Sequence, residues 1–234
     1  MNLLIEYFKP TNKERHQEYL TCLKENIKNT YISKIHIFTQ GETPELESDK
    51  MSIIKSDNRP TYKDFFEYCN NNLNDEICIV SNSDIIFDNS LGFINPDNIK
   101  GKFLALSRWD YNADKIKHYD IPYSQDSWIF KSPVNIPNCK FKLGTLGCDN
   151  RITYLAMKSG LIVTNPSKKI ITKHLHTSDY RTVSRDVKET IKGMYLLVDS
   201  NDSIDTPSYN IVSSPDEMGR VIENLMRRKM ANNI

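Results

Sequence analysis

The sequence has few glycines and lacks a cysteine pattern typical of a metal site. Eight of the 234 residues are glycine, and we read this scarcity as compositional bias without functional content. The five cysteines are odd in number and scattered, and none forms a C-x-x-C pair. We therefore expect reduced thiols in a reducing compartment. They are Cys22, Cys69, Cys78, Cys139 and Cys148.

Long apolar runs and an excess of charge are also missing. No window approaches the roughly 18 uninterrupted apolar residues of a membrane span, and "MNLLIEYFKP" is too short and too quickly acidic for a signal peptide. The 31 basic and 30 acidic residues leave a net charge of +1, so a broad electrostatic grip on nucleic acid or anionic membrane is not expected. We expect a cytoplasmic protein with one main domain and a small-molecule partner.

The pattern of apolar residues predicts an α/β fold. Capping-box spacing at Thr11 and Glu14, and again at Thr61 and Asp64, marks two helix starts between apolar runs. Strands that alternate with helices imply parallel pairing in a central sheet flanked by helices. The first four predicted strands cover residues 2–8, 34–38, 51–56 and 77–80.

The later part of the chain is less regular. A strand is expected over 102–110 and a short buried segment over 126–130. Asp149 is predicted to cap a helix that stops at Gly160. A terminal helix is expected over 216–230. We divide the chain into a main domain, 1–181, and a partly helical extension, 182–234, that packs on it.

A polar cluster interrupts the apolar stretch "EICIVSNSDIIFD" at residues 76–88. In open α/β sheets ligands bind beyond the carboxyl ends of the strands, and the cluster follows such an end. The same rule brings other strand ends to one pocket. They are Tyr7, Phe8, Thr39 and Arg59.

Asp84 is placed to hold a divalent cation against a diphosphate. Mg²⁺ and Mn²⁺ prefer one or two carboxylate oxygens and share their other positions with phosphate and water. The alternative is that residues 82–84 only form an Asx-type turn.

Two stretches of the sequence resemble one enzyme family. "NSDIIFD" (82–88) is similar to the D-x-D region of nucleotide-sugar glycosyltransferases with the GT-A fold. "CDNRITYLAMKSGLIVTNPSKKIITKHLH" (148–176) is similar to a later part of the same enzymes. The likeness extends over residues 2–181. More narrowly, "SQDSWIF", "LGTLGCDNRI" and "HLHTSDYR" resemble the capsid-decorating glycosyltransferase domains of large chlorella viruses, some of them rhamnosyltransferases.

The resemblance implies a GT-A-like fold and a metal-assisted donor site. It makes Asp84 the residue that meets the metal (Mn²⁺ or Mg²⁺) and the diphosphate, with Asn82 and Ser83 lining the ribose or sugar. His174 or His176 would complete the metal shell. Asn82 departs from the family pattern by replacing the first Asp, so a metal-independent site stays open.

Asp149 is the first candidate for the catalytic carboxylate. Transfer to a hydroxyl needs a base near the acceptor oxygen, and burial and neighbouring charges can tune an Asp for that role. The alternatives are a helix cap and, if the reaction retains anomeric configuration, a group that steadies the acceptor or the forming cation. Asp126 is the second candidate.

Three further side chains are candidates for donor contacts. Arg59 can pair with phosphate or stack on a base, and the phenol of Tyr62 can hydrogen-bond to the base or ribose. Arg108 is a candidate for the diphosphate or the acceptor. The alternatives are a solvated arginine and a helix-packing tyrosine.

Together these features predict a hexosyl- or deoxyhexosyltransferase. It would move a sugar from a nucleoside diphosphate, with UDP favoured, to a hydroxyl of a glycan or glycoprotein. The alternative is a non-catalytic nucleotide- or sugar-binding module derived from such an enzyme. A nucleotidyltransferase is disfavoured because "EYFKPTNKER" lacks a glycine-rich phosphate loop after the first strand.

Overall fold

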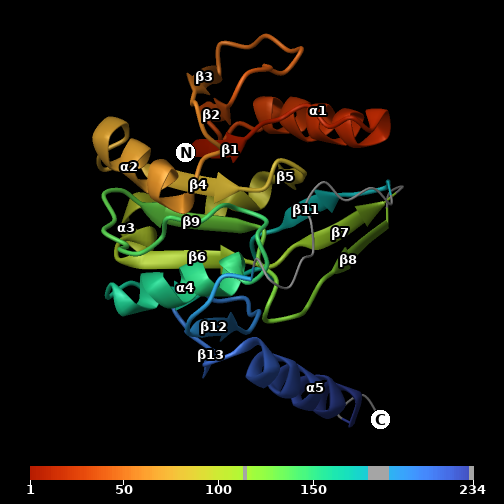
Figure 1. The fold of residues 1–234 in the computed structure, drawn as a ribbon, viewed down its shortest axis with the longest axis vertical. Helices are drawn as coiled ribbons and strands as arrows, with labels where there is room; N and C mark the ends of the chain where they lie inside the picture. The colour runs from red at the N-terminus through yellow and green to blue at the C-terminus, as the bar shows by residue number, and fades with distance from the viewer. Residues whose placement is uncertain (113–114, 179–189, 232–234) are drawn as a thin grey trace.

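The computed structural model describes residues 1–112, 115–178 and 190–231. At its centre is a seven-stranded sheet with the strand order β10-β6-β9-β4-β1-β2-β3, which descends from β3 at the top of Figure 1. Neighbours in it are parallel, except that β9 is antiparallel to β4 and β6. The predicted α/β architecture with a mostly parallel sheet is confirmed. The strands are β1 (Asn2–Glu6), β2 (Lys34–Thr39), β3 (Met51–Lys55), β4 (Ile77–Ser81), β6 (Lys102–Leu106), β9 (Ser127–Lys131) and β10 (Ile162–Thr164).

Two apolar cores lie on the two faces of this sheet. Successive strand residues point to opposite faces, so Leu4 belongs to one core and Leu3 to the other. The Leu4 core includes α2 (Tyr62–Asn72) and α4 (Cys148–Lys158). The Leu3 core includes residues of α1 (Lys13–Lys28), the 3₁₀ helix η1 (Asn89–Phe93) and α3 (Pro96–Ile99). Helices therefore flank the sheet on both faces.

A second sheet adjoins the carboxyl edge of the first. Its strands, in the order β5-β11-β7-β8, are β5 (Ile85–Phe87), β11 (Thr172–Leu175), β7 (Trp109–Asn112) and β8 (Lys115–His118). The single strand expected over 102–110 is thus two strands. The chain leaves the main sheet after Leu106, and β7 pairs with β11 instead.

The helix caps are partly as predicted. The Thr61 capping box is confirmed, with the Thr61 N–H donating to Asp64 Oδ2 at 2.7 Å. The first helix is capped by Asn12, whose Oδ1 accepts from the Arg15 N–H at 2.8 Å, so the cap expected at Thr11 was wrong. An asparagine caps at least as well as a threonine, and it starts the helix one residue later.

The C-terminal part adds a small sheet and a helix. Strands β12 (Tyr195–Val198) and β13 (Tyr209–Val212) pair with each other, and Leu196 and Val198 join the core around α4. Helix α5 (Pro215–Ala231) lies at the opposite end of the molecule from β3 in Figure 1. The domain boundary predicted at residue 181 lies outside the described residues and stays a prediction. Among the described helices, none has the length and apolar character needed to cross a membrane.

Candidate functional site

The antiparallel strand β9 determines which residues meet at the sheet edge. Parallel strands bring their carboxyl ends to this edge, whereas β9 begins there, with Ser127 paired to Ser81 at the end of β4. The residue before β9 therefore lies beside the residue after β4. This register places Asp126 next to Asn82, although 44 residues separate them in the chain.

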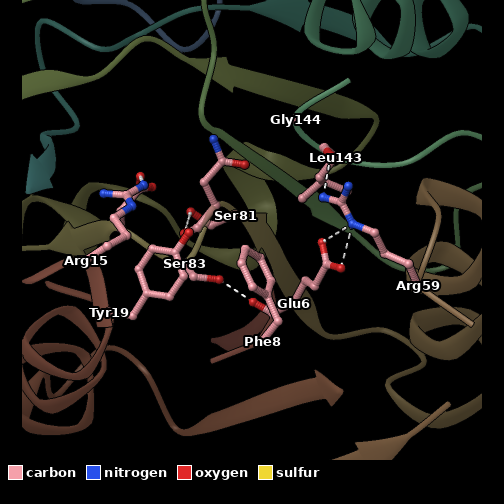
Figure 2. A pocket seen from close by; sticks show the side chains of 11 residues that line it. Glu6, Phe8, Arg15, Tyr19, Arg59, Ser81, Ser83, Leu143 and Gly144 are labelled. Atoms are coloured by element: carbon pink, nitrogen blue, oxygen red, sulfur yellow. Dashed lines mark hydrogen bonds and ion pairs between the residues drawn. The ribbon is translucent and has the colours of Figure 1, made fainter. Parts of the chain in front are cut away.

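A small deep pocket opens at the ends of β1 and β4. Figure 2 shows Arg15 and Tyr19 on one side of it and Glu6 and Arg59 on the other. Its volume is about 100 Å³. The lining residues are Glu6, Phe8, Arg15, Tyr19, Arg59, Ser81, Asn82, Ser83, Asp84, Leu143 and Gly144.

The Glu6–Arg59 ion pair forms one wall of the deep pocket. Arg59 Nε lies 2.7 and 3.0 Å from the two carboxylate oxygens of Glu6, and Arg59 Nη2 donates to the Leu143 carbonyl at 2.8 Å. The Ser83 hydroxyl donates to the backbone carbonyl of Glu6. The pair thus ties β1 to the loop before α4. The predicted residues Arg59 and Ser83 are both in this pocket.

A larger open cleft continues from the deep pocket and shares Arg15, Asn82, Asp84 and Gly144 with it. Its volume of about 540 Å³ lies within the range of small-molecule sites, roughly 300 to 1,000 Å³. Beyond the shared residues it is lined by Arg108, Tyr119, Tyr123, Ser124, Asp126, Thr145, Leu146, Gly147, Asp149, Asn150, His176 and Met218. Both predicted catalytic carboxylates therefore face one cavity with Asp84.

Asp84 is a buried carboxylate held between two cations. Its Oδ2 is ion-paired with Arg15 Nη2 and lies 3.1 Å from His174 Nε2. Burial alone would raise the pKa of Asp84, but His174 and Arg15 lower it well below its usual value. Asp84 is therefore ionised at any physiological pH.

Arg15 is itself fixed by a second carboxylate. Arg15 Nη1 donates to Glu18 Oε2 at 2.7 Å, one turn along α1. Glu18 Oε1 also accepts from the backbone N–H groups of Thr177 and Ser178, at 2.7 and 2.8 Å. Glu18 thus joins α1 to the chain that follows β11, and the guanidinium has little freedom to leave Asp84.

Asp84, His174 and His176 form a group that fits a divalent cation. One ligand atom from each lies within 4.8 Å of the others. The second carboxylate oxygen, Asp84 Oδ1, is buried and has no hydrogen-bond partner among the described residues. A buried acceptor without a partner is costly, and a bound cation would relieve that cost. The predicted metal ligands are thus gathered at one point.

His174, one of the three candidate metal ligands, is protonated at neutral pH. Burial disfavours the charged form of His174, but Asp84 and Asp110 outweigh it and raise the pKa of His174 to about 9. His174 Nδ1 lies 3.4 Å from Asp110 Oδ1 on the neighbouring strand β7. A metal would need neutral histidine, so binding it would displace this proton.

Asn82 occupies the position where the D-x-D pattern has its first acid, and its side-chain amide is hydrogen-bonded to Asp126. Its Nδ2 donates to Asp126 Oδ1 at 2.7 Å, and its backbone N–H donates to the Asp126 carbonyl at 3.0 Å. An aspartate at position 82 would instead bring two carboxylates into contact. The amide is therefore suited to this register.

Asp126 is engaged on both oxygens. Besides Asn82 on Oδ1, Arg108 Nη1 lies 3.2 Å from Asp126 Oδ2. Arg108 Nε also pairs with Asp110 Oδ1 at 2.8 Å, and its guanidinium lies 4.2 Å from the ring centre of Tyr119. Both predicted residues thus line the cleft, but Asp126 is held in an ion-pair network.

Asp149 is the carboxylate best suited to accept a proton. It lies in the first turn of α4, whose N-cap is Gly147 at φ +79°, so the prediction that Asp149 caps the helix was wrong. Burial and the nearby charge of Asp126 raise the pKa of Asp149 to about 7. A half-buried carboxylate that titrates near neutrality can act as a general base.

Three predicted donor residues line neither the deep pocket nor the open cleft. Tyr62 is fully buried against Trp128 and Phe141, with ring centres 5.1 and 5.3 Å away, so the expectation that its phenol contacts a donor is corrected. At the start of α2 its ring points into the core. Tyr7 and Thr39 line a side pocket of about 320 Å³ that shares Glu6 and Phe8 with the deep pocket.

Sequence reasoning missed Arg15, Glu18 and Glu6. A signal for Arg15 was present, because the first turn of a helix that follows a parallel strand starts at the same sheet edge as the strand end. No local pattern could indicate that Glu18 contacts Thr177 and Ser178, since these two partners lie about 160 residues away.

Comparison with models of protein families and with curated proteins gave no match. Among solved structures, the chain is similar to one described as a glucose-1-phosphate thymidylyltransferase from Bacillus anthracis, in complex with sucrose. The two share 11% sequence identity, with a TM-score of 0.43, over 70% of this chain and 85% of that one. At this level the likeness carries no inference for this chain.

Proposed function

We propose that the protein is a glycosyltransferase that moves a sugar from a nucleoside diphosphate to an acceptor hydroxyl. The observation that supports this best is the arrangement of two unlike carboxylates in one cavity. Asp84 lines both the deep pocket and the open cleft and is permanently ionised, whereas Asp149, which also lines the open cleft, titrates near pH 7. Oppositely shifted pKa values are typical of a division between charge stabilisation and proton transfer.

The donor would bind with its diphosphate near Asp84. A divalent cation held by Asp84, His174 and His176 would supply charge neutralisation for the departing nucleoside diphosphate. Arg15 would contribute to the same neutralisation. The nucleoside part would lie over the deep pocket, beside Glu6 and Arg59, because the pocket itself is too small to enclose it.

The acceptor would approach through the open cleft. Asp149 would take the proton of the attacking hydroxyl in an inverting reaction, while Asp126 and Arg108 shape the wall beside it. The choice of UDP, a deoxyhexose such as rhamnose, a glycan acceptor, a viral setting and a cytoplasmic location remain predictions from the sequence.

Product analysis separates this proposal from its alternatives. Purified protein is incubated with nucleotide sugars, MnCl₂ and candidate acceptors, and the nucleotide products are resolved by chromatography. Glycosyl transfer or donor hydrolysis releases the nucleoside diphosphate. A nucleotidyltransferase instead needs added pyrophosphate and then releases a nucleoside triphosphate and a sugar 1-phosphate from the same donor. Binding without any product, measured by calorimetry, indicates a non-catalytic module.

Two variants test whether donor binding depends on a metal at Asp84. Asp84→Ala is expected to abolish the part of donor binding that depends on Mn²⁺, because it removes the only carboxylate of the candidate metal group. Asp97→Ala, at an exposed position of helix α3, is the control. Equal Mn²⁺ dependence in the Asp84 variant would refute the metal assignment.

A further inference from the structure

A buried chain of hydrogen bonds ends on the candidate base. The Cys148 thiol donates to Asp149 Oδ1, with Sγ and Oδ1 3.0 Å apart. Behind it, the Tyr62 hydroxyl donates to Cys148 Sγ at 3.8 Å. Cys148 has 1% of its surface exposed and Tyr62 none, so water does not compete for these contacts.

Burial determines the direction in which these hydrogen bonds are donated. Desolvation, together with neighbouring acidic groups, raises the pKa of both the Tyr62 phenol and the Cys148 thiol well above their usual values. Both groups therefore keep their protons across the working pH range and act as donors. Each proton is directed towards the cleft, with the carboxylate of Asp149 as the final acceptor.

The ring of Tyr62 is held by the core. It packs edge-on against Trp128 and against Phe141 from the loop before α4, and its backbone N–H donates to the Phe141 carbonyl at 3.0 Å. A phenol fixed in this way delivers its hydroxyl to one place. The thiol between the phenol and the carboxylate is the first residue of α4, so the helix itself orients it.

We propose that Tyr62 and Cys148 are positioning residues for Asp149. They hold Oδ1 through the phenol, thiol and carboxylate chain and leave Oδ2 to take the proton of an acceptor hydroxyl. This rests on the proposed function, in which Asp149 is the base. A donor to Oδ1 stabilises the ionised form and orients the carboxylate at the same time.

Other groups around Asp149 also shift its pKa. Asp126, just before β9, raises its pKa, whereas Arg108, after β6, and a hydrogen bond from the Gln125 backbone lower it. Loss of the thiol donor should therefore shift the titration upward without abolishing it.

The test measures the titration of Asp149 directly. Carboxyl ¹³C NMR follows its pKa in the full chain, with Asp149→Asn used to assign the resonance. Cys148→Ala is expected to raise the pKa by about 0.5 to 1 unit, since it removes one donor to a charged group. Cys148→Ser keeps a donor and should remain near the wild type, and Tyr62→Phe should shift it upward by less.

Matched controls separate this effect from a general loss of packing. Cys139→Ala also removes a buried thiol, one that donates to the Ile136 carbonyl. Tyr68→Phe removes a phenol of the same helix that contacts His36. Neither should move the Asp149 titration. An unchanged pKa in both Cys148→Ala and Tyr62→Phe would overturn the proposal, and either variant suffices if the other does not fold.

Activity separates this proposal from the proposed function. In the wild type, turnover should rise with the ionisation of Asp149, and Cys148→Ala should move that limb to higher pH and lower kcat more than it changes KM. If NMR shows the pKa shift but no substrate is turned over, the proposed glycosyl transfer is refuted, whereas the positioning of Asp149 by Tyr62 and Cys148 is supported. If turnover depends on Asp149 but the pH dependence of turnover is the same in Cys148→Ala as in the wild type, the positioning role of Tyr62 and Cys148 is refuted instead.

Discussion

The surroundings of Asp84 and Asp149 differ, although both carboxylates line the same cleft. Asp84 lies between Arg15 and His174, and its charge is compensated before any ligand arrives. Asp149 has Asp126 as a charged neighbour and a thiol as hydrogen-bond donor. One fold thus keeps one carboxylate permanently charged and leaves the other ready to exchange a proton. The difference arises from the charged groups that lie beside each acid, two cations at Asp84 and the acidic Asp126 at Asp149.

The largest effect is expected from removing the exchangeable acid. Asp149→Asn keeps the shape of the side chain but cannot accept a proton, so turnover should fall by about 10²- to 10⁴-fold, measured as kcat at pH 7.5. Donor affinity by calorimetry should stay close to the wild type, because the proposed donor site is on the Asp84 side. Full turnover in this variant, with a loss in Asp126→Asn, would transfer the role to Asp126.

Next in size is the loss of the compensating cation. Arg15→Met leaves Asp84 buried without its guanidinium, and removing one partner of a buried pair should destabilise the protein by about 3 kcal/mol, measured by urea unfolding at pH 7. Adding Asp84→Asn should restore part of the loss, because Glu18 still lacks the guanidinium. Lys28→Met, which breaks an exposed pair with Glu25, should change stability by less than about 0.5 kcal/mol. A similar small change in Arg15→Met would mean that the Asp84 side is not electrostatically compensated.

The two acids should also give opposite pH dependences of stability. The folded pKa of Asp149 is raised to about 7, so its ionisation costs stability increasingly as pH rises from about 4 to 7. Asp84 has a lowered folded pKa, so its contribution is present above about pH 4 and is lost on acidification. Asp149→Asn should therefore gain about 1 to 3 kcal/mol relative to wild type between pH 5 and pH 8. A difference that is flat with pH would argue against the raised pKa.

The smallest effect tests the position where the D-x-D pattern is broken. Asn82→Asp places a carboxylate against Asp126 Oδ1, now 2.7 Å from the amide nitrogen, and should destabilise the protein by about 1 kcal/mol at pH 8. The loss should shrink at pH 5, where the two acids can share a proton. Asn82→Ala controls for loss of the amide and should show no such pH dependence. Tighter Mn²⁺ binding in Asn82→Asp, measured by calorimetry, would instead show that a second acid is tolerated.

Local patterns predicted the first half of the fold well. The Thr61 capping box and the apolar runs up to Val80 depend on neighbours in sequence, and the structure contains them nearly where expected. Asp84 was predicted at the sheet edge because parallel strands place their ends by topology alone, and it lies there.

The other parts of the fold were not predicted because they depend on contacts between residues far apart in the sequence. The antiparallel direction of β9 and the second sheet depend on which strands meet, and the pattern within 126–130 does not reveal it. Tyr62 looked available for a ligand because a tyrosine at a helix start is compatible with either surface or core. Its burial follows from Trp128 and Phe141, which are far from it in the chain.

The connection between β6 and β9 has a consequence for how new specificities could arise. Because these strands are antiparallel neighbours, with Leu106 paired to Ser127, the chain leaves the main sheet and returns to it at adjacent points. That excursion carries Arg108, Tyr119 and Asp126 to the open cleft, while Asp84 and the deep pocket belong to other segments. Exchange of residues 107–125 would thus replace a segment with closely spaced ends, but it would also remove β7 and Asp110, which contact β11 and His174. The wall of the open cleft and the surroundings of His174 would therefore change together.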